Sequence, residues 1–314
     1  MRDLSPAAGS RRAIGRPRLA ASTLALCALA CAGTSVARAQ RAPLDEPSIE
    51  LTARDLARGP ATAPRAVAVL RNEVTLLERL LAATRQGDPM TASLCERQMR
   101  ALLELSRAVR AQSPEESRRA LERAFALSRR LAELNPSGAS SERNALAHAS
   151  LVEELVDLAT ARPLYMRLVA EHPSGTTPAI VFALFGDETS LRGDPEIAQR
   201  FYERAMASAP RETFLHGYCL YRLAWLDARR SRDQESLRRF TEVLSHARNI
   251  ASMAGATELA AAARRDLVVP YARIGRRDRA EVFFRRFATP EETREMLARL
   301  DARLAARRRH RGNR

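Results

Sequence analysis

The chain has 314 residues, of which 46% are hydrophobic, 28% charged and only 5% aromatic, and its formal net charge is +15. Alanine, leucine, arginine and glutamate dominate, which favours helices, and no segment alternates polar and apolar residues as a half-buried strand does. Every basic residue is an arginine, and the arginines alternate with acids along the predicted helices, which argues against a nucleic-acid-binding protein.

Residues 1–39 have the three-part layout of a secretory signal peptide. A basic region precedes an uncharged apolar run, and a small-x-small pattern ends at Ala39. The apolar run is about 14 residues long, shorter than the roughly 20 that span a bilayer. We therefore expect cleavage between Ala39 and Gln40 and a mature chain without a transmembrane span, exported to the periplasm or cell envelope of a bacterium. An uncleaved anchor and a lipid anchor at Cys31 are the less favoured alternatives.

Two regions of weaker pattern follow the signal peptide. Residues 40–65 contain four prolines and are predicted to be a linker with at most one short helix near 48–58. Residues 66–140 read as amphipathic helices separated by turn residues, at Gly87-Asp88-Pro89 and Ser113-Pro114. They are predicted to form helical hairpins with a degenerate repeat pattern.

The clearest repeat unit covers residues 179–210. Two helical stretches flank a Gly-Asp-Pro turn, with Asp194 at a position suited to an N-cap and Pro195 at the first helical position. Small residues recur where two helices would approach closely, and large apolar residues recur beside them. The positions that define the unit are Phe182, Phe185, Gly186, Gly193, Ala198, Tyr202, Ala205 and Pro210.

Three weaker copies begin near Glu142, Gly217 and Ala261, at intervals of 37, 38 and 44 residues. A recurring period is itself a sign of a repeat architecture, and insertions between hairpins cost little. Residues 141–292 are therefore predicted to be a repeat array. Residues 293–306 are predicted to be a C-terminal capping helix, and residues 307–314 a basic disordered tail.

This spacing resembles the tetratricopeptide (TPR) motif, from which the best unit departs at Thr189, where the motif usually has an aromatic residue. The resemblance implies an all-α fold, a TPR-like right-handed superhelical solenoid of antiparallel helix hairpins. Together with the signal peptide, the irregular repeats resemble exported envelope proteins: the Tol-Pal-associated coordinator family, the outer-membrane assembly lipoprotein family and the TPR proteins of gliding-motility complexes. That likeness implies a scaffold role in the cell envelope.

Motifs of catalysis, cofactor binding and metal binding do not occur in the sequence. The five histidines lack metal-ligand spacing, and there is no nucleophile elbow, phosphate loop or C-x-x-C motif. Adjacent acids such as Glu153-Glu154 and Glu291-Glu292 are predicted to be solvated or to begin helices. We expect no enzyme activity, no cofactor and no metal. Cys95 and Cys219 lie in well-separated hairpins and are expected to be free thiols.

One row of residues is a candidate partner-binding groove. In a TPR-like array the first helix of each hairpin lines the concave side, and Tyr221, Trp225 and Arg229 follow one another at helical spacing on such a helix. Arg265 and Arg273 continue the row in the next unit. The competing interpretation is that Trp225 packs against the neighbouring hairpin.

These features predict an exported TPR scaffold that binds one or more protein partners. The alternative is a non-catalytic helical platform of a peptidoglycan-processing or other envelope enzyme complex.

Overall fold

The computed structural model describes residue 49 and residues 52–58, 65–85, 88–134 and 141–312. The predicted signal peptide, its cleavage site and Cys31 lie outside these residues. The chain divides into a unit over residues 1–45 and a unit over residues 46–314, and everything below concerns the second unit.

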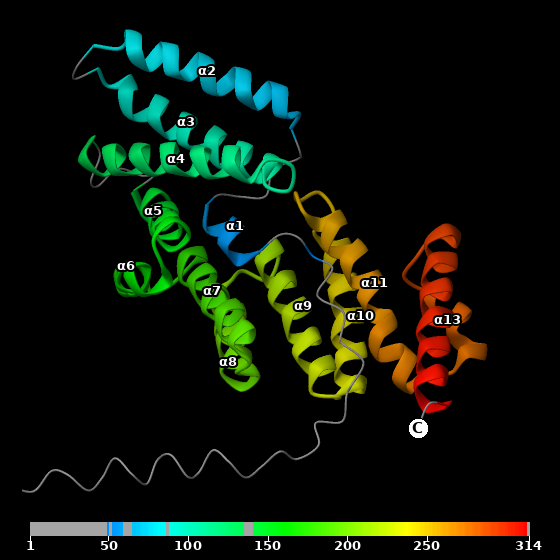
Figure 1. The fold of residues 1–314 in the computed structure, drawn as a ribbon. Coiled ribbons are helices and arrows are strands. Elements are labelled where there is room, and N and C mark those ends of the chain that lie inside the picture. Colours follow the sequence, from blue (N-terminus) through cyan, green and yellow to red (C-terminus); the bar gives the residue numbers. More distant parts are fainter. Residues whose placement is uncertain (1–48, 50–51, 59–64, 86–87, 135–140, 313–314) are drawn as a thin grey trace, which may run out of the picture. The chain divides into compact units, whose positions relative to one another are not determined.

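The described residues are helical and contain no strand, as the sequence predicted (Figure 1). The elements are α1 (Ala53–Ala57), α2 (Val67–Ala83), α3 (Met90–Val109), α4 (Pro114–Leu134), α5 (Ser141–Leu155), α6 (Leu158–Glu171), α7 (Thr176–Arg192), α8 (Pro195–Ser208), α9 (Phe214–Arg229), α10 (Asp233–Asn249), α11 (Ala256–Ile274), the 3₁₀ turn η1 (Arg277–Arg279), α12 (Ala280–Phe284) and α13 (Pro290–Gly312).

From α5 to α11 the helices pack in consecutive pairs and form a helical-repeat solenoid. The first helices of the pairs, α5, α7, α9 and α11, contact one another in order, and we call them the inner layer. The second helices α6, α8 and α10 each pack between their own partner and the following inner helix. Each pair therefore touches only its neighbours, which is the construction of a solenoid.

Burial follows the predicted repeat register in all four units. A small residue and, four residues later, an aromatic residue have no exposed surface in each unit. These pairs are Ala161 and Tyr165, Ala198 and Tyr202, Ser236 and Phe240, and Ala280 and Phe284. Residues four apart lie on one face of a helix. In each pair a small side chain and an aromatic ring therefore lie side by side on the face that packs against the inner helix.

Helices α7 and α8 approach each other closely at Gly186 on α7. A Cβ atom placed there would lie 2.6 Å from Cε1 of Tyr202 on α8. The turn that follows was also predicted. Gly193 ends α7 in the left-handed region with φ 89°, which glycine adopts without strain. Asp194 occupies the N-cap position of α8 but makes no capping hydrogen bond, and Pro195 is in the first turn.

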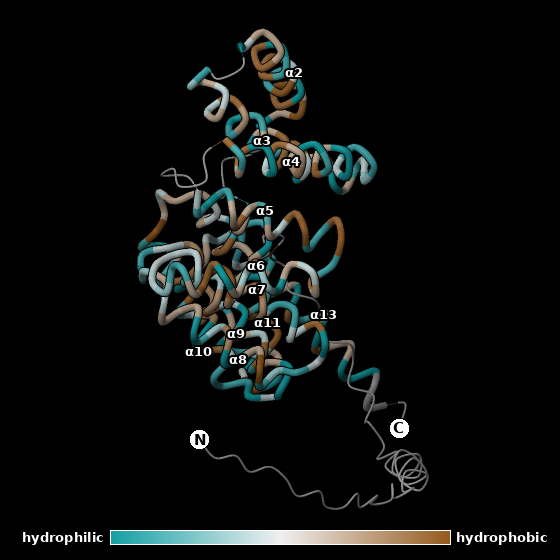
Figure 2. Tube along the Cα trace, turned by 90° about the vertical axis from the view of Figure 1, so that its left-hand side faces the viewer, coloured by the Kyte–Doolittle hydropathy of each residue, from teal (hydrophilic) through white to brown (hydrophobic). Residues whose placement is uncertain are grey.

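Helices α2, α3 and α4 share a core with the start of the solenoid. Apolar residues from α2 to α5 form one buried cluster, in which Leu77, Leu102 and Leu151 are among the most enclosed. The outward face of α2 exposes Val69, Leu76 and Leu80, and brown segments mark this helix in Figure 2.

The C-terminal helix is longer than predicted. We expected a helix over 293–306 and a disordered tail over 307–314, but α13 begins at Pro290 and continues to Gly312. Arginine has high helix propensity, and basic residues are favourable near a helix C-terminus. The Arg307 side chain also donates a hydrogen bond of 2.5 Å to the carbonyl of Ala272 on α11. The expectation for the tail was therefore wrong up to residue 312.

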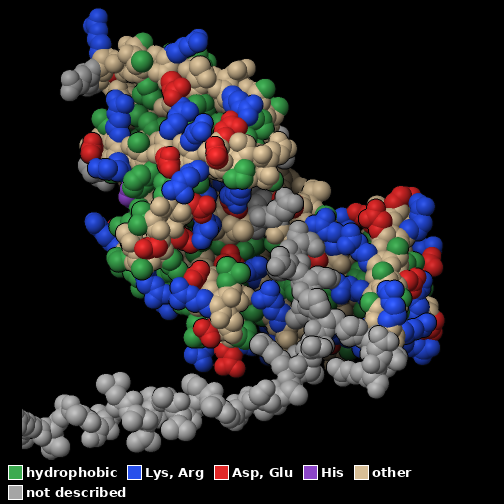
Figure 3. Space-filling model, in the orientation of Figure 1, with side chains coloured by type: hydrophobic (Ala, Val, Ile, Leu, Met, Phe, Trp, Pro, Cys, Tyr) green, Lys and Arg blue, Asp and Glu red, His purple; other side chains and the backbone are tan. Residues whose placement is uncertain are grey.

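The surface is highly charged but mixed in sign. Basic and acidic side chains are interspersed over the face drawn in Figure 3, and many form i,i+4 ion pairs such as Arg118 with Glu122. None of the helices in the described part of the chain has the length and apolar character to cross a membrane.

Candidate functional site

Residues 49 and 52–58, the inner segment, lie against the inner layer and include the single-turn helix α1. Thr52 caps this turn. Its hydroxyl accepts from the N–H of Asp55, and the Asp55 carboxylate accepts from the N–H of Thr52. Ala53 and Ala57 are buried, and their small side chains let α1 approach α7 and α5 closely. Because Arg54 and Arg58 are four residues apart, their side chains extend from the same face of the turn.

These two arginines bind acids of α5. Arg54 pairs with Glu153 at 2.5 Å and with Glu154 at 2.9 Å. Arg58 pairs with Glu154 at 3.2 Å and donates to the hydroxyl of Ser150 at 3.1 Å. The Arg58 side chain is almost fully buried, and this burial lowers its pKa despite the nearby carboxylates. Pairing is thus what makes burial of the guanidinium tolerable.

The backbone of the inner segment is also held by side chains. The N–H of Ile49 donates to the hydroxyl of Tyr221 on α9 at 3.3 Å. The N–H of Ala53 donates to the carboxylate of Asp187 on α7 at 3.3 Å. Backbone groups of the segment therefore meet side-chain acceptors from two further inner helices.

On its other side the inner segment is bound by α3. Asp55 pairs with Arg110 at 2.9 Å, and Arg107 donates to the carbonyl of Asp55 at 2.7 Å. Burial disfavours the ionised carboxylate, but Arg110, Thr52 and Arg107 outweigh this effect and lower the pKa of Asp55. The segment thus carries one buried acid toward α3 and two arginines toward α5.

The acceptors on the inner layer are fixed within the solenoid itself. Asp187 accepts from the hydroxyls of Tyr202 and Tyr218, each at 2.6 Å, and pairs with Arg222 at 3.0 Å. Burial and the Asp187 carboxylate raise the pKa values of both tyrosines well above the ordinary value, so their hydroxyls stay protonated and donate. Glu153 accepts from the hydroxyl of Tyr165 at 2.8 Å.

Tyr221 and Trp225, from the predicted groove row, meet at a single carboxylate. The Tyr221 hydroxyl and the Trp225 indole N–H both donate to Asp266 on α11, the latter at 2.8 Å. Trp225 is only 2% exposed and packs edge-on against Phe240. The indole is thus enclosed between α10 of its own hairpin and α11 of the next, whereas Tyr221 reaches the inner segment through its hydroxyl oxygen.

The three arginines of the row are half-buried and held within the solenoid. Arg229 donates to the Ser190 hydroxyl at 3.4 Å. Arg273 pairs with Asp233 at 2.7 Å and donates to the carbonyl of Ala228 at 2.7 Å. Arg265 likewise has an interaction partner. The structure therefore joins Tyr221 and Trp225 in one cluster at Asp266.

Several residues of this surface were missed in the sequence. Glu153 was predicted to be solvated, which is wrong: it is 9% exposed and bound by Tyr165 and Arg54. Glu291 and Glu292 do lie in the first turn of α13, as predicted. Asp187 and Asp266 were not among the predicted groove residues. Asp187 occupies the same repeat position as Trp225, and this was the available signal for it, whereas Asp266 lies beside the predicted row.

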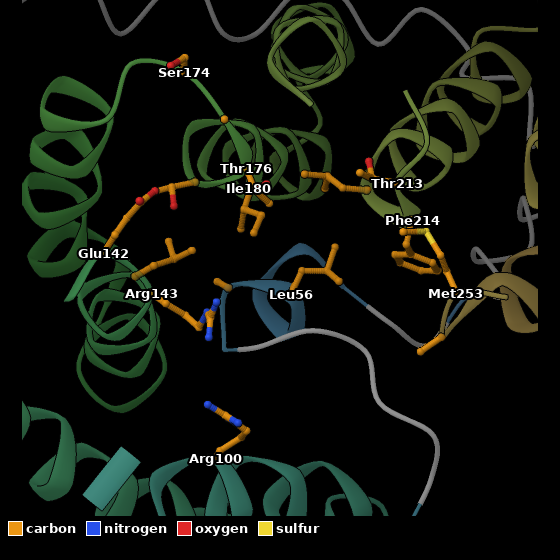
Figure 4. A pocket seen from close by; sticks show the side chains of 16 residues that line it. Leu56, Arg100, Glu142, Arg143, Ser174, Thr176, Ile180, Thr213, Phe214 and Met253 are labelled. Carbon is orange, nitrogen blue, oxygen red and sulfur yellow. The ribbon is translucent and has the colours of Figure 1, made fainter. Parts of the chain in front are cut away.

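A cavity of about 720 Å³ lies beside the inner segment. Figure 4 shows Leu56 of α1 between Arg143 of α5 on one side and Phe214 with Met253 on the other. Ile180 of α7 also lines it, and Arg100 of α3 stands at its edge. The inner segment therefore fills one part of the surface and leaves an apolar space next to it.

Among the described residues, no three His, Cys, Asp or Glu side chains are placed to hold one metal ion. Cys95 and Cys219 are both buried free thiols, as predicted.

No protein-family model matches this chain, and comparison with curated proteins finds no significant relative. The fold and the surface alone define the class: an all-α helical-repeat solenoid whose inner layer holds a short peptide segment through side-chain hydrogen bonds and ion pairs.

Proposed function

We propose that this protein is an exported TPR-type scaffold of the bacterial cell envelope, which binds other proteins through the surface of its inner layer. The observation that carries the proposal is the inner segment. A stretch of extended and single-turn backbone is held by Tyr221, Asp187 and Glu153, which come from three different inner helices. Recognition of backbone N–H groups and charged side chains by a fixed surface is how folded domains bind peptides.

The anchoring of these acceptors supports the same proposal. Asp187 and Glu153 each keep tyrosine hydrogen bonds that do not involve the inner segment. A surface that is ordered before its ligand arrives loses less conformational entropy on binding. The signal peptide expected over residues 1–39 supports export, and the register of small and aromatic residues supports the TPR assignment.

The proposal is tested by site-specific photo-crosslinking in cells that produce the full chain. A photoreactive residue at Met253, beside the cavity, is compared with one at Ile197 on α8, because the two side chains are similarly exposed, at 43% and 47%. We expect discrete protein adducts from Met253, recovered in the envelope fraction, and none from Ile197. Absence of adducts from both positions, or recovery of the protein only in the cytosol, would contradict the proposal.

A further inference from the structure

The inner segment occupies a surface that we have proposed to bind other proteins. We propose that this segment is an internal ligand, and that a partner binds by presenting a helical turn with two arginines four residues apart, which displaces it. This inference rests on the proposed function and adds the chemistry of the partner segment.

The first step of the argument is the specificity of the contacts. Arg54 and Arg58 project from one face of the turn and share Glu154, while Arg54 also reaches Glu153. Arg54 contacts both acids, whereas the contact with Ser150 is made by Arg58. The acids and Ser150 on α5 therefore match an arginine pair at i and i+4.

The second step is that the surface remains assembled when the segment leaves. Tyr165 stays bonded to Glu153, and Tyr202 and Tyr218 stay bonded to Asp187. Tyr221 keeps Asp266 as its acceptor. Asp187, Tyr221 and Glu153 thus each have a hydrogen-bond partner inside the solenoid. Displacement of the segment does not leave these groups unpaired.

The third step is that the segment itself is weakly built. Helix α1 has five residues, far fewer than an isolated helix needs to be stable in water. The Arg54 side chain is 39% exposed and Glu154 is 33% exposed, so water reaches this ion pair and weakens it. Membership of the same chain adds to the buried contacts of the segment an effective concentration on the order of millimolar, which an external segment has to overcome.

The cavity supplies the place where an external segment first binds. It is lined by Leu56 of the inner segment together with Ile180 and Phe214, so an apolar side chain can enter beside α1 while the segment is still bound. Arg143 and Glu142 stand at its edge, as Figure 4 shows. A partner that first fills this apolar space is then positioned to replace the arginine pair.

The test uses the full mature chain and, as the probe, a fluorescent peptide with the sequence of residues 46–60. The variant Arg54→Glu/Arg58→Glu releases the inner segment by placing acids opposite Glu153 and Glu154. The matched control, Arg118→Glu/Arg294→Glu, makes the same change of charge at two exposed arginines, at 68% and 73% exposure. Fluorescence anisotropy measures binding of the peptide, and circular dichroism confirms the fold of each variant.

We expect the released variant to bind the peptide at least about tenfold more tightly than the wild type and the control, since the internal competitor is gone. A peptide with both arginines changed to glutamate is expected not to bind. Equal affinity for the released variant and the wild type, or no binding to a folded released variant, would overturn the proposal. A wild type found to be a dimer by light scattering, with the segment exchanged between copies, would also overturn it.

If the released variant does not fold, hydrogen exchange on the wild type decides the question. Excess peptide should accelerate exchange of the amides of residues 52–58, and unchanged exchange would refute displacement. These measurements use purified protein and are independent of export. Failure of peptide binding with successful crosslinking at Met253 would reject only the arginine-pair ligand, whereas failure of crosslinking alone would reject the proposed envelope function.

Discussion

The hydroxyl group of Tyr221 on α9 donates a hydrogen bond to the carboxylate of Asp266 on α11, and both side chains are buried. The same oxygen accepts the N–H of Ile49 from the inner segment. One side chain thus connects two neighbouring hairpins to a residue that is 172 positions away in sequence. This relationship explains how the inner segment and the stability of the repeats are linked.

Removal of the Tyr221 hydroxyl should weaken both the packing of the repeats and the attachment of the inner segment. We expect Tyr221→Phe to reduce the free energy of unfolding by about 1–3 kcal/mol, because Asp266 loses one buried donor and the N–H of Ile49 loses its acceptor. Thermal unfolding followed by circular dichroism measures the change. Tyr271→Phe is the matched control, since its hydroxyl bonds only to the carbonyl of Arg276 in a part-buried position. An equal or larger effect in the control would contradict the role given to Tyr221.

Acid should release the inner segment. Asp55 has a lowered pKa in the folded protein, so its stabilising contribution is present above the ordinary carboxylate pKa near 4 and is lost as the pH falls through the lower folded value. We expect Asp55→Asn to destabilise the protein by about 1–3 kcal/mol at pH 7 and to flatten the acid limb of the stability curve. Urea unfolding between pH 3 and 7 measures both effects. Asp301→Asn, at an exposed ion pair with Arg277, should leave the curve nearly unchanged.

The contact between α7 and α8 should not tolerate added volume. Ala198 has no exposed surface, and a Cβ at Gly186 would overlap the Tyr202 ring. We expect Ala198→Leu and Gly186→Leu each to lower the free energy of unfolding by about 1–3 kcal/mol or more. Ala207→Leu, at an exposed position of α8, is the control and should have little effect. Unchanged melting midpoints for both core variants would mean that the two helices do not pack at these residues.

The two thiols should be inaccessible in the native protein. Burial raises the pKa of Cys219 and of Cys95 above the ordinary thiol value, so little thiolate is available to react. We expect alkylation by iodoacetamide at pH 8 to be slow in the native chain and to modify both residues in denaturant. Mass spectrometry of the non-reduced protein gives the count. An intact Cys95–Cys219 bridge would contradict the structure.

Export should remove the first 39 residues. The small-x-small pattern before Gln40 predicts that the mature protein begins at that residue. N-terminal sequencing of protein recovered from the envelope tests this, and Ala39→Leu should block the cleavage. A mature chain that starts with a lipidated Cys31, or that retains Met1, would show that the signal was misassigned.

The sequence alone determined the helices and their register. The recurrence of Ala198 with Tyr202 and of Ser236 with Phe240 identified which faces pack, because small and aromatic residues four apart mark a close helix contact whatever surrounds them. Turn residues such as Gly193 and Pro195 determined where the two helices of a hairpin meet, for equally local reasons, since backbone conformation at these positions depends on the residue itself. Helix α13 extended further than expected because a run of arginines is compatible with a helix as well as with a disordered tail, and the sequence pattern did not distinguish the two.

Only the tertiary structure decided what covers each face. Helical spacing placed Tyr221 and Trp225 on one side of α9, but it could not show that Asp266 of the next hairpin and Ile49 of a distant segment would meet them there. Likewise Glu153 reads as a solvated acid until Arg54 and Tyr165 are brought to it. Periodicity reports the direction of a side chain relative to its own helix, whereas burial and pairing depend on which other helices fold against that face. Contacts between residues of different helices are therefore decided only when the solenoid is assembled.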